Sequence, residues 1–290
     1  MLNIMKFRPL FIFVSCFLVV GSLLSIWFWG FKYSIDFAGG TIWQLEFSSD
    51  AKSTNFEKVF TDNKLEINSL NFNGKIADIK LKLITQDEKL KYESEIKKID
   101  PGVKELRFET VGPILGKELI QKTIIAIILS SLSLLIFIGT KFKDFSFGAS
   151  AVLAMFHDAF ILIGAFSLLG HFFGAELDAL FVTALLTTLS ASVHDTVVTF
   201  DRIRELKRKN FRLEWVSLAN QAVSEVIVRS INNSMTIIFM LLSLVVLGGI
   251  TTRWFAMALL IGVVCGTYSS TAVAIPLVLF WKNIKNKNNK

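Results

Sequence analysis

Six long apolar segments constrain this chain more than any other feature. Each is long enough to cross a hydrocarbon core of about 30 Å, which takes about 20 helical residues. Inside a bilayer every backbone N–H and C=O group must be paired internally, so such segments form α-helices. The chain has 290 residues, of which 52% are hydrophobic and 19% charged, and its 27 Phe outnumber its three Tyr, as suits lipid-facing surface. The sequence predicts a polytopic α-helical membrane protein with six transmembrane helices.

The boundaries follow from where the apolar runs begin and end. The predicted spans are residues 10–30, 123–140, 147–170, 178–200, 231–249 and 253–281. Residues 31–122 form a soluble domain, residues 201–230 a charged amphipathic segment, and residues 1–9 and 282–290 are short tails. The first span is interpreted as an anchor, because its apolar run exceeds the ~7–15 residues of a signal peptide and no Ala-x-Ala site follows.

Lysine and arginine in the short loops predict the orientation, since these residues are enriched on the cytoplasmic side. The tails, the 141–143 loop and the 201–212 segment are rich in them, whereas the loops at 171–176 and 248–253 together hold one. Both termini and the 201–230 segment are therefore predicted to be cytoplasmic. The 31–122 domain is then extracytoplasmic.

The domain between the first two spans alternates strand and helix patterns. Asn73-Gly74 separates two apolar runs and is a strong hairpin signal. Asp100-Pro101-Gly102 ends a charged helix. The predicted order is strand 41–47, helix 53–63, strands 65–72 and 76–84, helix 86–99 and strand 103–111. This β-α-β-β-α-β order is the ferredoxin-like pattern.

Several classes of function are excluded. The net charge of +7 is not arranged as a basic stripe with stacking aromatics, so the expected partner is membrane lipid and not nucleic acid. The cysteines, Cys16 and Cys265, lie inside apolar runs and give neither a disulfide framework nor metal-ligand spacing. Neighbouring helical residues point about 100° apart, so the two His-Asp dipeptides do not predict a metal site. No nucleophile has an adjacent base, so no enzyme, catalytic residue or cofactor is expected.

Asp195 is the main candidate functional residue. A charge at the bilayer centre costs about 2.5–3.5 kcal/mol on insertion scales and usually faces a partner, a cavity or an ion path. Small hydroxyl residues share or flank its helical face: Thr188, Ser192, Thr196 and Thr199. Two interpretations remain open. Asp195 is either a protonatable switch beside a polar pathway, or an acid satisfied by a donor within a helix–helix interface.

Further candidate proton-coupling residues lie on neighbouring spans. Arg229 opens the fifth span at a depth comparable to that of Asp195, so an ion pair is plausible; the alternative is that Arg229 extends to the headgroups. His157-Asp158 in the third span repeats the dipeptide His194-Asp195 in the fourth. The charged run that follows Phe200 is either a solvated face or a docking surface.

Five segments together resemble one family. They are Ile35–Thr41 with Asp36, Gly39 and Gly40; Val111–Leu119 with Gly112, Pro113 and Gly116; His157-Asp158; Asp195–Glu205 with Asp201, Arg202, Arg204 and Glu205; and Arg229–Ser234. In this order, and with one span, a domain and five spans, they resemble the SecF branch of the SecD/SecF family of the resistance-nodulation-division superfamily.

The resemblance implies a role in protein export. Members pair with SecD beside the SecYEG channel in the bacterial cytoplasmic (inner) membrane, with YajC and YidC as further candidate partners. They are understood to use the proton-motive force to promote export of unfolded preproteins. Asp195 and Arg229 match the family's important membrane acid and base. His194 stands where Asn is usual, and Asn233 where Thr is common, which leaves the titration of Asp195 open.

Two other functions remain as alternatives. The chain is either a subunit of a small-molecule or lipid efflux pump of the same superfamily, or a structural scaffold with a fixed Asp195–Arg229 pair. Efflux pumps generally carry two large external domains on twelve spans, whereas this chain has one small domain on six. A fixed pair predicts that Asp195→Asn or Arg229→Ala weakens assembly but leaves the proton dependence of export unchanged.

Overall fold

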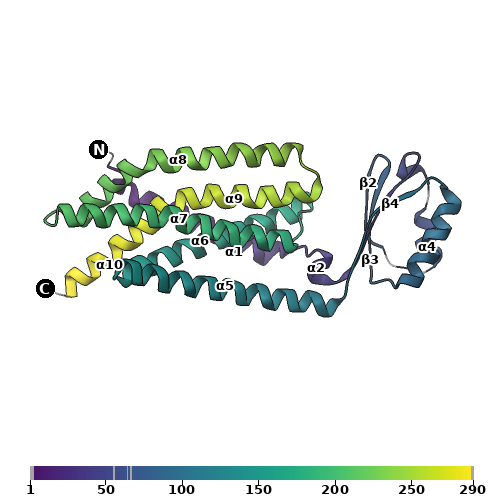
Figure 1. Ribbon diagram of the computed structural model, residues 1–290, viewed down its shortest axis with the longest axis horizontal. Helices are drawn as coiled ribbons and strands as arrows, with labels where there is room; N and C mark the ends of the chain where they lie inside the picture. Colours follow the sequence, from purple (N-terminus) through teal and green to yellow (C-terminus); the bar gives the residue numbers. More distant parts are fainter. Residues whose placement is uncertain (1–2, 55, 64, 66, 289–290) are drawn as a thin grey trace. The chain divides into compact units, whose positions relative to one another are not determined.

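The computed structural model of the chain describes residues 3–54, 56–63, 65 and 67–288. The chain divides into two compact units. One comprises Met1–Lys32 with Ile125–Lys290, and the other comprises Tyr33–Ile124. The first is a helical bundle and the second is a small sheet with helices (Figure 1).

Six helices among the described residues are long and apolar enough to cross a membrane. This confirms the predicted fold class of a polytopic helical protein. The bundle unit also contains the short 3-10 helix η1 (Ile4–Phe7). Its α-helices are α1 (Arg8–Trp29), most of α5 (Pro113–Phe142), α6 (Phe145–Phe173), α7 (Ala179–Lys209), α8 (Trp215–Leu247), α9 (Ile250–Ala272) and α10 (Ala274–Asn288).

The helices extend beyond the predicted spans. Charged residues continue α7 to Lys209, and α8 already begins at Trp215, so most of residues 201–230 is part of these two helices. The last span is divided at Val273 into α9 and α10. Pro276 explains the division, because proline lacks an N–H donor and its ring clashes with the carbonyl four residues earlier.

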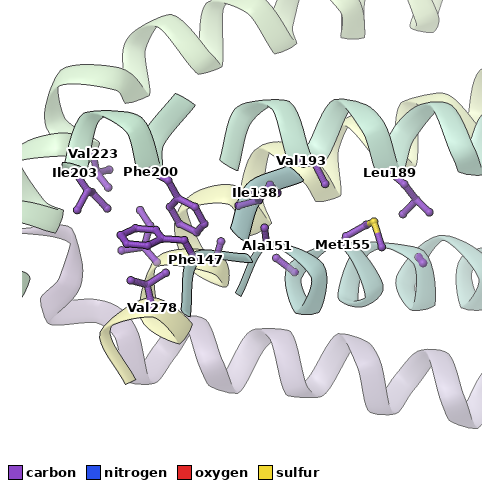
Figure 2. Packing of buried hydrophobic residues seen from close by; sticks show 14 of the residues in the cluster. Ile138, Phe147, Ala151, Met155, Leu189, Val193, Phe200, Ile203, Val223 and Val278 are labelled. Carbon is purple, nitrogen blue, oxygen red and sulfur yellow. The ribbon is translucent and has the colours of Figure 1, made fainter. Parts of the chain in front are cut away.

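The bundle packs around α7, which contacts α6, α8 and α9. Phe142, Phe147 and Phe200 lie together at one end of its core, where the Phe147 and Phe200 rings are 5.0 Å apart and edge to face. Figure 2 shows smaller residues such as Ala151 and Val193 filling the layers farther along the bundle. Because lipid tails are as apolar as these side chains, close van der Waals packing holds the helices together.

Small residues bring α1 and α6 into close contact. A Cβ added at Gly164 would lie 2.2 Å from Cβ of Ser22, so a larger residue does not fit there. The hydroxyl of Ser25 donates to the carbonyl of Gly164 at 3.1 Å. Ser167 on α6 donates to the carbonyl of Gly30 at 2.7 Å. These hydroxyls donate hydrogen bonds to backbone carbonyls of the facing segment of the same chain, as is common in membrane bundles.

A buried lysine closes one end of the bundle. Lys282 on α10 pairs with Asp144, which precedes α6. Its ammonium lies 4.7 Å from the Trp215 ring centroid and 5.3 Å from that of Phe147. Burial opposes ionisation of Asp144, but hydrogen bonds from Lys282 and Ser146 prevail and hold its pKa below the ordinary value. The C-terminal helix is thus fastened to the start of α6.

The second unit is a four-stranded antiparallel sheet in the order β2-β3-β1-β4. Its strands are β1 (Gly40–Glu46), β2 (Ile67–Asn73), β3 (Ile76–Leu81) and β4 (Lys104–Val111). Gly74, with a φ of 60°, supplies the left-handed turn of the β2–β3 hairpin. This strand order confirms the predicted ferredoxin-like arrangement.

Helices of this unit cover the apolar side of the sheet. They are the 3-10 helix η2 (Ala51–Thr54), α3 (Glu57–Asp62) and α4 (Gln86–Ile99), whereas the short helix α2 (Ile35–Ala38) precedes β1. The helix predicted over residues 53–63 is shorter than expected, because η2 occupies its start. Residues 55 and 66, within the predicted helix and strand, lie outside the described residues. Trp43, with no exposed surface, is at the centre of the core and donates to Glu105 at 3.0 Å.

Both ends of α4 are fixed by hydrogen bonds. Thr85 and Glu88 form a capping box at its N-terminus. Beyond its C-terminus, Asp100 accepts hydrogen bonds from the backbone and hydroxyl of Ser48 and from the N–H of Gly102. The backbone bond from Ser48 contributes most to lowering the pKa of Asp100, while burial opposes it.

Candidate functional site

Asp195 lies on α7 and is half-buried. Asp178 caps this helix by accepting a hydrogen bond from the N–H of Phe181 at 2.7 Å. The Asp195 carboxylate accepts a hydrogen bond from the hydroxyl of Ser230 on α8 at 2.7 Å. The acid is therefore held in the interface between α7 and α8.

Two cavities meet at Asp195. One, of about 240 Å³, lies toward α9 and is lined by Ser192, Ser234 and Thr267 among others. The other, of about 280 Å³, lies toward α8 and includes Arg229 and Ser230. Both cavities are also lined by His194, Asp195 and Asn233. The acid thus borders open space on two sides while it is hydrogen-bonded to α8.

Arg229 shares a cavity with Asp195 but does not pair with it. Among the described residues Arg229 has no ion-pair partner, and its side chain is exposed on α8. Neighbouring helical residues point about 100° apart, and Ser230 is the one that faces the acid. The predicted Asp195–Arg229 ion pair is not formed in this structure, although the shared cavity brings the two groups to one site.

The more buried acid is Asp158 on α6, with 4% of its surface exposed. Its Oδ2 accepts hydrogen bonds from Ser192 on α7 and Ser269 on α9, each at 2.6 Å. Its Oδ1 lies 3.0 Å from Nδ1 of His157. Sequence reasoning named Ser192 but missed Ser269, whose only signal was a hydroxyl residue within an apolar span.

The four hydroxyl residues of the predicted polar pathway differ in their hydrogen-bond partners. The hydroxyls of Thr188, Thr196 and Thr199 are buried but donate to carbonyls of α7 itself, three or four residues earlier. Ser192 differs, because its hydroxyl donates to Asp158 and it also lines a cavity with Asp195. Ser192 therefore lies between the two acids, bonded to Asp158 and facing the cavity beside Asp195. The threonines instead form hydrogen bonds within their own helix.

Glycines of α9 allow α7 to approach. A Cβ at Gly262 would lie 2.3 Å from Cγ2 of Thr188, and one at Gly266 would lie 3.0 Å from Cβ of Ser192. Real Cβ contacts are essentially never shorter than 3.0 Å, so Gly262 accepts no side chain without a shift of the helices. This close approach places Ser192 and Ser269 around the same carboxylate.

The charged residues after Phe200 tie α7 to its neighbours. Asp201 pairs with Lys141 at 2.8 Å, and Arg204 donates to the carbonyl of Lys141 at 2.7 Å. Arg202 bonds to Glu205 on its own helix and to Glu225 on α8. These contacts hold the beginning of the charged segment against α5 and α8.

The two glycine motifs meet within the sheet unit. A Cβ at Gly116 would lie 2.4 Å from the carbonyl oxygen of Phe37, next to Asp36. One at Gly39 would lie 3.0 Å from Cα of Pro113, which follows Gly112. Gly39 and Gly40 have φ of 77° and 138°, values that favour glycine. The motifs are thus explained by close backbone contact.

No group of three or more His, Cys, Asp or Glu side chains is placed to hold a metal ion among the described residues. Cys16 and Cys265 are both free, and they lie on different helices, α1 and α9. The polar groups at the site are the carboxyls of Asp158 and Asp195, the imidazoles of His157 and His194, the Arg229 guanidinium and surrounding hydroxyls. Such a set can bind and release protons.

Comparisons with known proteins agree with one another. A family profile described as "Protein export membrane protein SecD/SecF, C-terminal" matches residues 91–284. The protein translocase subunit SecF of Thermobaculum terrenum is 37% identical, covering 98% of this chain and 95% of its own length. That of Haemophilus influenzae is 32% identical over 94% of this chain and 84% of its own. The subunit SecDF of Thermus thermophilus is 33% identical and covers 88% of this chain.

A solved structure has the same fold. The crystal structure of SecDF from Thermus thermophilus, described as a translocon-associated membrane protein, superposes with a TM-score of 0.82 at 29% identity. The match covers 97% of this chain and 39% of that longer one. Profile, relatives and structure together show that the chain belongs to the SecD/SecF family of protein-export membrane proteins, as a SecF subunit.

Proposed function

We propose that this subunit uses the proton-motive force, together with SecD, to promote preprotein export through the Sec channel. A role as an accessory subunit of Sec protein export is supported by the translocase relatives. Coupling to protons rests on one observation above all. The Asp195 carboxyl lies between two cavities, one of which also contains a cationic side chain.

The surroundings of this site support a protein partner. His194, Arg229, Asn232 and Asn233 are exposed on α7 and α8. Polar and charged groups at membrane depth face protein or water and not lipid, so this surface is covered in the complete assembly. SecD is the partner we propose, because relatives include a fused SecDF chain of which this sequence matches 35%.

Protonation of Asp195 changes the balance between α7 and α8. When ionised, the carboxylate accepts the Ser230 hydrogen bond and attracts Arg229 across the shared cavity. When protonated, it no longer attracts the cation, and the two helices are free to repack. One elementary charge crossing 100 mV supplies about 2.3 kcal/mol, so a few protons suffice to bias a two-state bundle.

The proposed topology places the bundle in the bacterial cytoplasmic membrane. The start of η1 and the end of α10 lie at the same end of the bundle in Figure 1, as is required if both termini are on one side of the membrane. Enrichment of lysine and arginine assigns that side to the cytoplasm. The ferredoxin-like unit is then extracytoplasmic, where it meets the emerging preprotein.

SecYEG is the proposed channel partner, with YajC and YidC as further subunits. In this proposal the protein works as a transport subunit and not as an enzyme.

Transport into inverted membrane vesicles tests the proposal. A preprotein intermediate is formed, ATP is removed, and completion is measured with and without a proton gradient. We expect the gradient to complete transport in the wild type but not in Asp195→Asn. Asp201→Asn is the matched control, because it makes the same change on the same helix at a surface ion pair. Equal gradient-driven completion in Asp195→Asn and Asp201→Asn would refute the proposal and favour a structural acid.

A further inference from the structure

Asp158 is a buried carboxyl about midway along α6 that has no strong cation beside it. The structure pairs it with no lysine or arginine among the described residues, and its nearest ionisable neighbour is His157. An isolated carboxylate in a low-dielectric interior is costly unless it is hydrogen-bonded or takes up a proton. Asp158 is therefore either a permanently ionised structural anchor or a site that binds protons.

His157 does not neutralise this carboxylate. Its Nδ1 contacts Oδ1 of Asp158, whereas its Nε2 is buried without a hydrogen-bond partner among the described residues. An imidazolium would place a second N–H at Nε2, where no acceptor is available to it, and a buried unpaired donor is unfavourable. The neutral tautomer with hydrogen on Nδ1 fits both observations. The pair then carries a full negative charge whenever Asp158 is ionised.

The surroundings of Asp158 accommodate both protonation states. In the ionised state Oδ2 accepts from Ser192 and Ser269, and Oδ1 accepts from His157. In the protonated state Oδ2–H needs an acceptor. Ser269 can supply it, because its hydroxyl has a second acceptor of its own, the carbonyl of Gly266 at 3.4 Å. A rotation of one hydroxyl therefore exchanges the two hydrogen-bond patterns and keeps the carboxyl and both serine hydroxyls hydrogen-bonded in each state.

Ser192 lies between the Asp158 carboxyl and a cavity. Its hydroxyl donates to Asp158, and the same residue lines the 240 Å³ cavity that also contains Asp195. The other titratable groups near the pair are on α9. Tyr268 presents its ring to His157 with centroids 6.5 Å apart, while its hydroxyl bonds to Phe11 and Ser15 of α1. Cys265 on the same helix has a free thiol.

We propose that Asp158 is a second proton-binding site of this subunit, reached from the Asp195 cavity through Ser192. A proton from the cavity adds to Oδ2 of Asp158, the carboxylate becomes a neutral carboxylic acid, and Ser269 turns its hydroxyl hydrogen toward Gly266. Release reverses these steps. Binding of the proton stands on this geometry alone, whereas its use in export rests on the function proposed above.

Infrared difference spectroscopy of the full chain with SecD in proteoliposomes tests the proposal. Spectra are recorded from about pH 5 to about pH 9. We expect a carboxylic-acid C=O band that appears as the pH falls and that is lost in Asp158→Asn. The band should persist in Asp195→Asn, which separates the two acids. Its absence at every pH, or its presence unchanged at every pH, would overturn the proposal.

A second variant covers the case in which Asp158→Asn fails to insert. Ser269→Ala removes one hydroxyl donor and acceptor but keeps the acid. We expect the pH-dependent band to remain and to change frequency, because its hydrogen bond is lost. A band of unchanged frequency in Ser269→Ala would show that it does not come from Asp158. Since infrared reads proton binding and not export, this result is independent of the vesicle assay with Asp195→Asn.

Discussion

Substitution of Gly262 tests whether the α7–α9 contact holds the polar site together. The perturbation is Gly262→Ala, one methyl group facing Thr188. Its Cβ would lie 2.3 Å from Cγ2 and 2.4 Å from Cβ of Thr188. Ordinary contact begins at 3.4 Å, so the helices must move apart by about 1 Å. Overpacking of this kind costs about 1–3 kcal/mol.

Alanine has a higher helix propensity than glycine, which stabilises the variant, so the experiment needs a control for this gain. Replacing glycine by alanine within a helix gains roughly 0.5–1 kcal/mol when nothing is in the way. Gly139 on α5 has no atom within 4 Å of an added Cβ, so Gly139→Ala isolates this gain. Gly266→Ala, at 3.0 Å from Ser192, should lie between the two. Because this gain is common to both variants, we expect Gly262→Ala to be about 1–3 kcal/mol less stable than Gly139→Ala, which is the overpacking cost.

The measurement is unfolding of the full chain in mixed micelles by titration with sodium dodecyl sulfate, followed by circular dichroism. A double-mutant cycle checks the cause. The double variant Gly262→Ala with Thr188→Gly should show a favourable coupling free energy, because it lacks the side chain that clashes with the added methyl group. Equal stability of Gly262→Ala and Gly139→Ala would refute the reasoning and show that α9 does not approach α7 so closely.

Two further predictions concern the sheet unit. Trp43→Ala should lower the free energy of unfolding of the sheet unit by about 3–5 kcal/mol, because Trp43 is fully buried. Limited proteolysis should then cleave within residues 33–124 while the bundle, which has its own core, stays resistant. Cleavage of both units together would contradict two separate cores. Asp100 has a lowered pKa, so its contribution to stability is present above about pH 4 and is lost as the pH falls through its folded-state pKa. Hydrogen exchange of the β1 and β4 amides should show that acid destabilises the wild type more than Asp100→Asn. Equal acid destabilisation of the two proteins would show that Asp100 is not its cause.

The sequence predicted the architecture well because its signals are local. Apolar length gave the six spans, and Asn73-Gly74 with the flanking alternation gave the β2–β3 hairpin. The limits of helices were less accurate, because charged residues such as Arg202 continue a helix into solvent without any breaking signal. Pro276 divided the last span, and the apolar pattern alone does not show this.

The site was harder to predict because it depends on which faces meet. Asp195 and Arg229 do line one cavity, but helical periodicity did not show that Ser230, and not Arg229, contacts the acid. Asp158 acquired its importance from Ser269, which is 111 residues away in the chain. Hydroxyl residues are common in membrane helices, and only the packing of α9 against α6 and α7 distinguishes this serine from its neighbours.

The partners of Asp158 have a consequence for biogenesis. The helix that carries the acid is synthesised before either serine that satisfies it, since Ser192 follows by 34 residues and Ser269 by 111. During insertion α6 therefore holds a carboxyl that has His157 beside it but lacks both of its serine donors. An unpaired carboxylate is expelled from lipid much more strongly than a neutral acid. The nascent helix must then wait beside the insertion machinery, or enter with Asp158 protonated, until α9 arrives and completes the bundle.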